Sequence, residues 1–428
     1  MADLKPAETN PWYVLSTLHG PQTGERIDWD LARKNVALWN VWSCQKLTDE
    51  QREKLSAGGA KLPDVDAWKQ QKEEIETLYK KRFSEMGIGE DEMPEIPDAE
   101  SQIDMSTIAF SHIVVWEKAI FGQDADFMSA TFAQDAYFMS ATFAQSADFD
   151  SATFTQSASF NSATFAEFAD FSSATFAQFA YFTSATFAQS ADFMSATFSG
   201  FAYFRKVQFG TDTPPDFGYS ARFSDAIFER PTSFRDACFK YRYPILDGTV
   251  FHDKTQFTAE RAFWPQGNQP NPKQAKESCA TLRHVMAKQG LPEDEYFFFR
   301  KEMEFSGKIG GFWRTRPVKA YGVFSDYGAS IAKPLAGLGA LWLGCALIYM
   351  VAFNWPGVVD PEFVPAGKGF GFSIANMVKF LGFQRTYYAG VIQNIPNWMQ
   401  FLAAVQTTFA YVLVFFLGLG LRSRFRLR

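Results

Sequence analysis

The most regular pattern in the chain is a recurrence of phenylalanine between residues 110 and 209. Two series, each with a period of 11 residues, interleave at alternating steps of 5 and 6. A helix with 3.6 residues per turn cannot keep such positions on one face, whereas short extended walls joined by corners can. The pattern therefore predicts coils of four walls and 22 residues. The two series are Phe110, Phe121, Phe132, Phe143, Phe154, Phe165, Phe176, Phe187, Phe198 and Phe209, and Phe127, Phe138, Phe149, Phe160, Phe171, Phe182, Phe193 and Phe204.

The residue before each Phe supports the same coil length, because it repeats every 22 residues rather than every 11. One wall has Asp at this position, a second has Tyr or Ser, and the remaining two have Thr. A small Ala two residues before most of these Phe residues lets the four walls close around a narrow core. Equivalent residues of stacked coils are expected at the β-ladder spacing of about 4.8 Å. The Asp wall carries Asp126, Asp148, Asp170 and Asp192, and the Tyr wall carries Tyr137, Ser159, Tyr181 and Tyr203.

The stretch Ala-Asp-Phe-Met-Ser-Ala-Thr-Phe-Ala-Gln, residues 125–134, resembles the pentapeptide-repeat proteins in a Phe-centred variety. This resemblance implies a mainly β fold, a right-handed quadrilateral β-helix, over roughly residues 103–263. Seven coils are expected. An insertion with Pro214 and Pro215 interrupts the frame, which is expected to resume at Phe217.

Residues 1–100 predict a mostly helical cap over the first coil, since the ends of a solenoid need cover. Trp12–Leu15 is expected to be extended. Asp28 or Asp30 is expected to cap a following helix, and Thr48 to begin another with a capping box. Residues 64–86 are expected to form a charged helix. The sequence therefore predicts a helical N-terminal region followed by a solenoid domain at residues 101–265.

The C-terminal part predicts a helical connector, residues 266–330, and a membrane domain, residues 331–428. Helices are expected at 272–289 and 292–308. Uncharged runs at about 335–353 and 398–421 are long enough to span a bilayer. Ala336, Ala340 and Gly344 form a small-residue ridge that predicts a helix-packing face. A shorter run at about 369–383 is expected to form either a re-entrant helix or an amphipathic helix on the outer surface.

Charge changes along the chain. Residues 1–265 are acidic, whereas residues 266–428 carry 18 basic and 9 acidic groups. Because the basic part also holds the apolar runs, an anionic membrane surface is a better partner than nucleic acid. Basic residues flank both spans on the same side, which predicts cytoplasmic N- and C-termini; the polar first residues likewise predict no signal peptide. The flanking residues are Arg314, Arg316, Lys319, Lys333, Arg422, Arg424, Arg426 and Arg428.

Three groups of residues are candidates for function. The Asp wall is expected either to bind a divalent cation or to satisfy local backbone groups. Phe168, Phe179 and Phe201 occupy the extra residue of six-residue steps, and Phe179 and Phe201 stack beside Tyr181 and Tyr203. These aromatic residues are expected either to form a partner surface or to pack under a neighbouring segment. The candidate pore-facing residues are Gln400, Thr407, Thr408, Ser373 and Asn376.

The sequence predicts no catalytic, cofactor or metal site, because its four histidines are widely separated and no phosphate-loop pattern is present. Its four cysteines lack a pairing rhythm, so no disulfide scaffold is expected. We therefore expect a non-enzymatic protein.

The tail also resembles that of membrane-anchored bacterial pentapeptide-repeat proteins, which implies the bacterial inner membrane. The similarity lies in residues 296–303, 372–376 and 418–422.

The sequence leaves three interpretations of function. The first interpretation is a membrane-anchored scaffold or sensor whose solenoid binds an unknown protein. The second is a homo-oligomeric, pore-loop-like ion channel with a cytoplasmic solenoid. The third is an acidic DNA mimic, as in family members that bind DNA gyrase. Membrane lipid and further copies of the chain are the expected partners.

Overall fold

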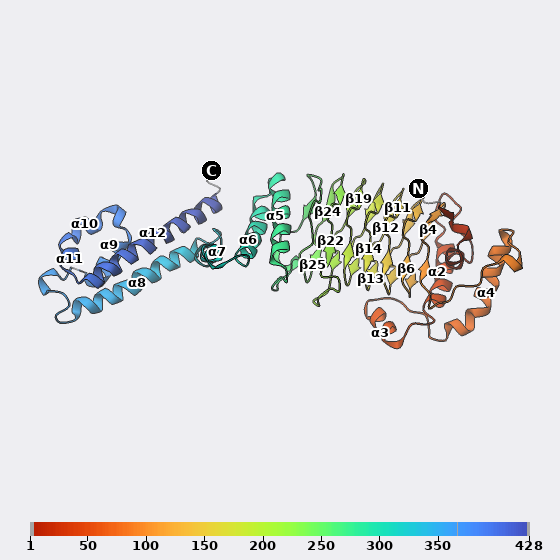
Figure 1. Cartoon of the computed structure of the whole chain (residues 1–428), viewed down its shortest axis with the longest axis horizontal. Coiled ribbons are helices and arrows are strands. Elements are labelled where there is room, and N and C mark those ends of the chain that lie inside the picture. The colour runs from red at the N-terminus through yellow and green to blue at the C-terminus, as the bar shows by residue number, and fades with distance from the viewer. Residues whose placement is uncertain (1–3, 366, 426–428) are drawn as a thin grey trace. The chain divides into compact units, whose positions relative to one another are not determined.

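The computed structural model describes residues 4–365 and 367–425, which fall into two compact units (Figure 1). We call Met1–Glu302 the solenoid unit and Met303–Arg428 the helical unit. The division lies inside the segment predicted to be a single helical connector.

The solenoid unit is a four-sided stack of about seven turns with parallel strands, as predicted. Between residues 103 and 209, strands pair with the strand 22 residues further on, for example Ala147 with Ala169 and Asp148 with Asp170. Across the insertion the step is longer, as between Ala191 and Ala221. The Ala-Asp wall comprises β2 Ile103–Asp104, β6 Ala125–Asp126, β10 Ala147–Asp148, β14 Ala169–Asp170, β18 Ala191–Asp192 and β22 Ala221–Arg222. The first Thr-Phe wall comprises β1 Lys5–Pro6, β3 Ile108–Phe110, β7 Thr131–Phe132, β11 Thr153–Phe154, β15 Thr175–Phe176, β19 Thr197–Phe198 and β23 Ile227–Phe228. The Ala-Tyr wall comprises β4 Val114–Val115, β8 Ala136–Tyr137, β12 Ala158–Ser159, β16 Ala180–Tyr181, β20 Ala202–Tyr203, β24 Thr232–Phe234 and β26 Gln256–Phe257. The second Thr-Phe wall comprises β5 Ile120–Phe121, β9 Thr142–Phe143, β13 Thr164–Phe165, β17 Thr186–Phe187, β21 Gln208–Phe209 and β25 Cys238–Phe239.

The core consists of columns of Phe rings. Phe149 lies parallel to Phe127 below it and Phe171 above it, with ring centroids 4.7 and 4.9 Å apart. It also meets Phe138 of the facing column edge to face at 5.6 Å. The intervening alanines, such as Ala147, are buried. The large and small residues predicted to point inward therefore do so.

Tight turns with a serine in the left-handed region form corners of the coils. At Phe127–Ala130, the Ala130 N–H donates to the Phe127 carbonyl at 3.0 Å, and Ser129 has φ of 57°. This conformation costs a residue with a Cβ about 1 kcal/mol. The Ser129 N–H also donates to the Asp150 carbonyl of the next coil at 2.8 Å. Stacking of coils therefore holds a turn that the serine alone would not favour.

The N-terminal cap contains four α-helices, and one of them was predicted wrongly. Residues 12–15 are helical rather than extended, because Asn10 accepts hydrogen bonds from the Trp12 and Tyr13 N–H groups and Pro11 occupies the first helical position. Asp28 and Thr48 cap the next two helices as expected, and Thr48 does so in a capping box. The helices are α1 Pro11–Ser16, α2 Trp29–Ser43, α3 Asp49–Ala57 and α4 Ala67–Glu85, with short 3-10 helices at Ala7–Thr9 and Glu90–Glu92.

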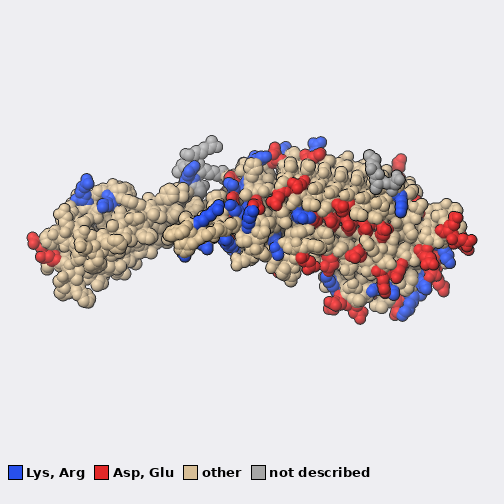
Figure 2. All heavy atoms as spheres, viewed as in Figure 1, with Lys and Arg blue, Asp and Glu red and all other residues tan. Residues whose placement is uncertain are grey.

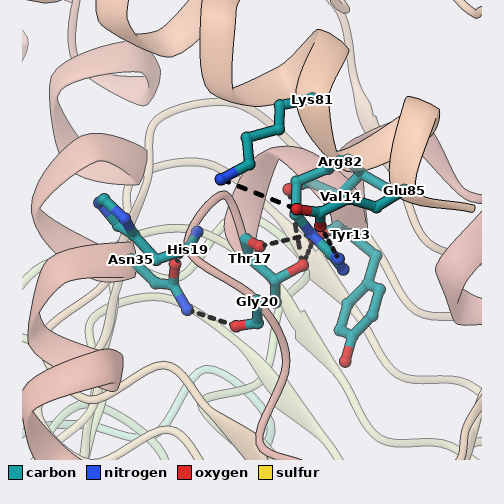
Figure 3. A network of polar contacts seen from close by, with 9 residues as sticks. All are labelled: Tyr13, Val14, Thr17, His19, Gly20, Asn35, Lys81, Arg82 and Glu85. Atoms are coloured by element: carbon teal, nitrogen blue, oxygen red, sulfur yellow. Dashed lines mark hydrogen bonds and ion pairs between the residues drawn. The ribbon is translucent and has the colours of Figure 1, made fainter.

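Polar contacts tie α1, α2 and α4 together (Figure 3). The Asn35 side chain accepts from the His19 N–H at 2.8 Å and donates to the Gly20 carbonyl at 2.9 Å. Arg82 Nε donates to the Thr17 carbonyl at 3.2 Å. The helices thus form one body over the first coil.

This cap also covers part of the solenoid's side. Leu55 of α3 packs in a buried cluster with Ile120 and Ala144 of the second Thr-Phe wall. Lys54 pairs with Glu167 of a later coil at 2.7 Å. The N-terminal region is therefore both an end cap and a clasp along one wall.

The far end of the solenoid is closed by stacked aromatic rings and two helices. Trp264 stacks on Phe239 of the last coil at 5.0 Å and meets Phe298 edge to face at 5.0 Å. The frame was expected to resume at Phe217, but that side chain is 58% exposed. Pairing resumes at β22 instead, and Phe223 is the first core ring after the insertion. The closing elements are the 3-10 helix Arg261–Phe263, α5 Pro272–Lys288 and α6 Pro292–Ser306.

The helical unit is built around two apolar helices, α8 Ala332–Asn354 and α12 Asn397–Phe425. Both are long and apolar enough to cross a membrane, in agreement with the predicted spans. Arg426 and Arg428, predicted to flank the second span, lie outside the described residues. The other elements are α7 Phe312–Ser325, α9 Lys368–Met377, α10 Phe383–Tyr387, α11 Ala389–Asn394 and 3-10 helices at Pro361–Phe363 and Lys379–Leu381.

The short helix α9 packs against both α8 and α12. Its Phe372 is buried and meets Tyr349 and Phe353 of α8 at 4.9 and 5.7 Å. Gly369 lies so close to α8 that a Cβ there would be 2.2 Å from the Ala346 carbonyl oxygen. Helix α9 therefore packs on both apolar helices, while its Phe370 and Ile374 remain exposed. The choice between a re-entrant helix and one on the outer surface stays a prediction.

Within one copy of the chain, the small-residue ridge of α8 is not used for helix packing. Ala336, Ala340 and Gly344 are all exposed. The helix instead directs larger residues inward, including Tyr349 and Phe353. The bulk of α9 and the close approach of Gly369 account for this difference, because α8 packs mainly on α9.

Candidate functional site

The predicted partner surface is a continuous stack of four rings at one corner of the solenoid. Phe179 and Phe201 occupy the corner that leads into the Ala-Tyr wall, and Tyr181 and Tyr203 follow on that wall. Ring centroids lie 5.9 Å apart for the two Phe residues, 5.2 Å for the two Tyr residues and 5.7 Å between Phe179 and Tyr181. Phe179 and Phe201 are 37% and 39% exposed. We call these four residues the aromatic corner.

Phe168 occupies a different corner and is not part of this surface. It precedes the Ala-Asp wall, diagonally across the coil from Phe179. Phe217 of the insertion packs on it with ring centroids 4.5 Å apart. One of the extra aromatic residues thus packs under a neighbouring segment, while Phe179 and Phe201 remain exposed.

The Asp column uses its carboxylates to satisfy the backbone. Asp148 Oδ1 accepts from the Asp150 N–H at 2.8 Å, and Asp170 accepts from the Ser172 N–H at 2.8 Å. Burial, together with the neighbouring Asp carboxylates, raises the pKa of Asp126, Asp148 and Asp170 above the ordinary value. Among the described residues, no group of three or more His, Cys, Asp or Glu side chains is placed to hold a metal ion.

An ion pair with a buried carboxylate and a partly exposed guanidinium ends this column. Asp192 pairs with Arg222, the residue that replaces Asp in the next coil, and Arg222 Nε donates to Asp192 Oδ1 at 2.9 Å. The Tyr219 hydroxyl donates to the other carboxylate oxygen at 2.8 Å. Figure 2 shows acidic side chains along a face of the solenoid unit. The backbone hydrogen bonds of Asp148 and Asp170 and the Asp192–Arg222 ion pair explain why Asp is used at this wall, and none of these contacts involves a ligand.

In the helical unit, a cluster of polar side chains joins α9 to both apolar helices. Gln406 Nε2 donates to Ser373 Oγ at 2.7 Å and to the Ser373 carbonyl at 3.1 Å, and its Oε1 accepts from the Tyr349 hydroxyl at 3.3 Å. The Thr407 hydroxyl donates to the Asn376 carbonyl at 2.9 Å. Ser373, Asn376 and Gln406 are fully buried. Gln384 Nε2 donates to Asn376 Oδ1 at 2.6 Å. We call Tyr349, Ser373, Asn376, Gln384, Gln406 and Thr407 the polar cluster.

The structure brings together only some of the candidate pore-facing residues. Ser373, Asn376 and Thr407 meet in the polar cluster. Gln400 instead donates to the Ile395 carbonyl at 3.1 Å, and Thr408 is exposed and bonds to the Ala404 carbonyl of its own helix at 3.0 Å.

Sequence reasoning left Gln406, the central residue of the cluster, out of the pore-facing candidates, because it lies one position away from the helix stripe of Gln400, Thr407 and Thr408. A usable signal was present, since Gln406 belongs to a row of residues at steps of three and four that includes two small residues. This spacing marks one face of a helix, and all its members are buried. The row is Met399, Ala403, Gln406, Ala410 and Leu413.

A groove of about 610 Å³ lies between the clasp and the second Thr-Phe wall. Its lining is mixed, with Val36 and Ile120 beside hydroxyl groups such as that of Thr142. Two of its cations already have acidic neighbours, because Arg33 pairs with Asp30 and Lys118 pairs with Glu117. The lining of the groove therefore does not favour a ligand of one particular charge.

These features define a four-sided repeat solenoid whose walls are built from short Ala-x-Phe and Thr-Phe units. The sequence model described as pentapeptide repeats (9 copies) matches residues 117–164. The same 22-residue pairing continues on both sides of the matched segment. The solenoid of this chain is a pentapeptide-repeat domain. Neither a curated protein nor a solved structure matches the chain.

We predict that Asp148→Asn stabilises the solenoid at neutral pH. Asparagine keeps the oxygen that accepts from the Asp150 N–H and removes a charge stacked between like charges, an effect of about 0.5–1 kcal/mol. Because the pKa of Asp148 is higher in the folded state than in the unfolded state, the folded state binds the proton more tightly. The free energy of unfolding should therefore rise as the pH falls from neutral through the folded pKa towards 3.8.

Urea unfolding of the full chain in detergent, followed by the β-sheet circular dichroism signal at several pH values, measures this effect. The gain of Asp148→Asn over wild type should shrink as the pH falls. Asp91→Asn, an exposed residue of the cap, is the matched control and should change neither quantity. A destabilised Asp148→Asn protein at neutral pH would contradict the prediction.

We also predict that Gln406→Leu loosens α9. The substitution removes the hydrogen bonds that Gln406 makes with Ser373 of α9 and Tyr349 of α8, which costs about 1–2 kcal/mol. Gln400→Leu is the control, because Gln400 bonds only to the backbone of its own turn. Thermal unfolding of the helical unit, measured by helical circular dichroism of the full chain in detergent, should show a lower melting temperature for Gln406→Leu alone. Equal melting temperatures in the two variants would refute the role of the cluster.

Proposed function

We propose that this protein is a membrane-anchored scaffold in which the helical unit holds the chain in a bilayer and the solenoid binds a protein partner. The observation that carries the proposal is the exposure of the apolar helices. Only 22% of the most apolar window of each of α8 and α12 is buried. A core helix of a water-soluble protein would be mostly covered, so the exposure of these faces supports a lipid environment.

The outward residues form a broad apolar surface. Leu347 and Val351 on α8, and Val412 and Phe415 on α12, are between 41% and 63% exposed. Figure 2 shows the visible face of the helical unit with a wide band that lacks charged side chains. Tyr349, Gln406 and Thr407 of the two helices, by contrast, direct their polar groups towards α9 or one another. This distribution is the one that a hydrocarbon environment demands.

The aromatic corner supports a binding role for the solenoid. Its four rings are already ordered by stacking, so a partner would gain contact area with little loss of side-chain entropy. Aromatic residues are also enriched in the central parts of protein interfaces. The partner we propose is a protein, because residues 119–204 carry acidic residues but no Lys or Arg, and only Arg205 and Lys206 directly follow the corner, whereas nucleic acid requires an extended basic surface.

Basic residues at one end of the helical unit support the proposed orientation. Arg314, Arg316 and Lys319 precede α8, and Arg422 follows the apolar part of α12. Under the positive-inside rule, both flanks would lie in the cytoplasm. The similarity of the tail to membrane-anchored bacterial pentapeptide-repeat proteins supports placement in a bacterial inner membrane.

A homo-oligomeric channel is a second candidate, and the position of α9 favours it. Ser373 of α9 reaches Trp342 and Gln406, which lie near the middle of the two apolar helices. However, the polar groups at this depth bond to one another within one copy of the chain. A pore would therefore need other surfaces, contributed by several copies.

The third interpretation, a DNA mimic, has less support, because Asp148 and its neighbours bond to the backbone instead of projecting freely.

We predict that the wild-type protein remains in the membrane pellet after alkaline carbonate extraction. Leu347→Arg combined with Val412→Arg should release it or cause its degradation, since each Arg in the middle of a span costs about 3 kcal/mol. Val65→Arg, which adds an exposed charge to the solenoid unit, is the control. Extraction of the wild-type protein by alkali would refute the proposed anchor.

We further predict that a photo-reactive phenylalanine analogue at position 179 or 201 crosslinks to the same partner protein in intact cells. The analogue at position 217 is the control, because Phe217 is also exposed but lies by the opposite corner. Mass spectrometry of the crosslinked species identifies the partner. If all three positions gave the same products, or none gave a protein product, the aromatic corner would not be the binding surface.

A further inference from the structure

Helix α7 has an outer surface in which aromatic and basic side chains alternate. Trp313 is 86% exposed and Phe312 is 58% exposed. Arg314, Arg316 and Lys319 lie on the same helix and are exposed too. Exposure of a Trp next to a Phe to water is unfavourable, so we expect these two side chains to contact something other than water.

The basic residues of this surface are not neutralised within the protein. In the described part of the chain, no ion pair includes Arg314, Arg316 or Lys319. The Arg316 guanidinium instead lies over the Phe312 ring, 4.3 Å from its centroid. The helix itself contains no acidic residue. Its surface therefore combines uncompensated positive charge with apolar rings.

The fold places α7 at the basic end of the two apolar helices. Tyr321 of α7 stacks on Phe416 of α12 at 5.6 Å, and Phe324 also stacks on Phe416 at 6.3 Å. Ser330, just after α7, approaches Gly420 near the end of the apolar run of α12. Arg422 follows within the next half turn and is exposed. This is the level at which a bilayer would change from hydrocarbon to headgroups.

We infer that α7 is an interfacial helix that binds the headgroups of anionic phospholipids. This inference rests on the proposed membrane anchor and adds to it the class of lipid. Trp313 and Phe312 enter the boundary between headgroups and acyl chains, where amphipathic aromatic rings are favoured. Arg314, Arg316, Lys319 and Arg422 contact lipid phosphates, which match a guanidinium through paired hydrogen bonds.

Binding of headgroups by α7 gives the protein a preference for anionic lipids, which the apolar helices alone cannot give. Burial of α8 and α12 depends on acyl chains and does not distinguish phosphatidylglycerol from phosphatidylcholine. Each basic residue near an anionic surface adds about fivefold to binding, so the three on α7 should contribute on the order of 100-fold. Because exposed charges are screened, this preference should weaken as salt is raised.

The test uses native mass spectrometry of the full chain in detergent, which counts bound phosphatidylglycerol and phosphatidylcholine at matched concentrations. Wild type should bind phosphatidylglycerol preferentially. Combined Arg314→Gln, Arg316→Gln and Lys319→Gln should lose most of this preference. Lys69→Gln, Lys72→Gln and Lys81→Gln together, which remove three exposed charges from α4, should keep it.

Alkaline extraction of the same proteins separates this inference from the proposed anchor. The triple α7 variant should resist extraction, because α8 and α12 are unchanged. Equal binding of the two lipids by a wild-type protein that resists extraction would overturn the lipid inference alone. Preferential binding that survives in the α7 variant would also overturn it. A wild-type protein extracted by alkali would instead refute the anchor.

Discussion

Direct stacking of one Phe ring on the next, coil after coil, is the interaction on which the solenoid unit depends. Neighbouring rings such as Phe127 and Phe149 are 4.7 Å apart and nearly parallel, the spacing that a β-ladder imposes on equivalent residues. Two-residue strands have little pairing strength of their own. The buried columns keep them in register, and the register in turn holds left-handed corners such as Ser129.

The repeat made this part of the fold predictable from sequence alone. A period of 22 in the residue before each Phe defines which residues stack, and Asp148 does pair with Asp170. Asp28 and Thr48 were also recognisable because helix caps are local. The predictions that failed depended on distant contacts. The extended state expected for residues 12–15 ignored the cap at Asn10, and exposure of Phe217 depends on a loop that crosses to Phe168.

Predictability was lower in the helical unit, because hydrophobicity identifies a span but not its inward face. The small residues Ala336, Ala340 and Gly344 suggested one face of α8, while contact with α9 uses another. Gln406 was set aside because it lies off the polar stripe of α12. Its importance comes from Ser373, which is 33 residues away in sequence. Thr407, Ser373 and Asn376 were selected as pore-facing residues, and that role stays a prediction. Their contacts with α9 and the long helices could not be read from the sequence.

The exact match between stacked coils has a consequence for how such a protein changes its length. Duplication or loss of one complete coil returns every Asp, Tyr and Thr to its own wall, so unequal recombination within the gene can lengthen or shorten the rod without redesigning its core. Half a coil would instead set Asp against Tyr. The insertion between Asp192 and Arg222 offers a different route to novelty, because these residues still pair across the added loop. Rod length and surface decoration can thus evolve independently of each other.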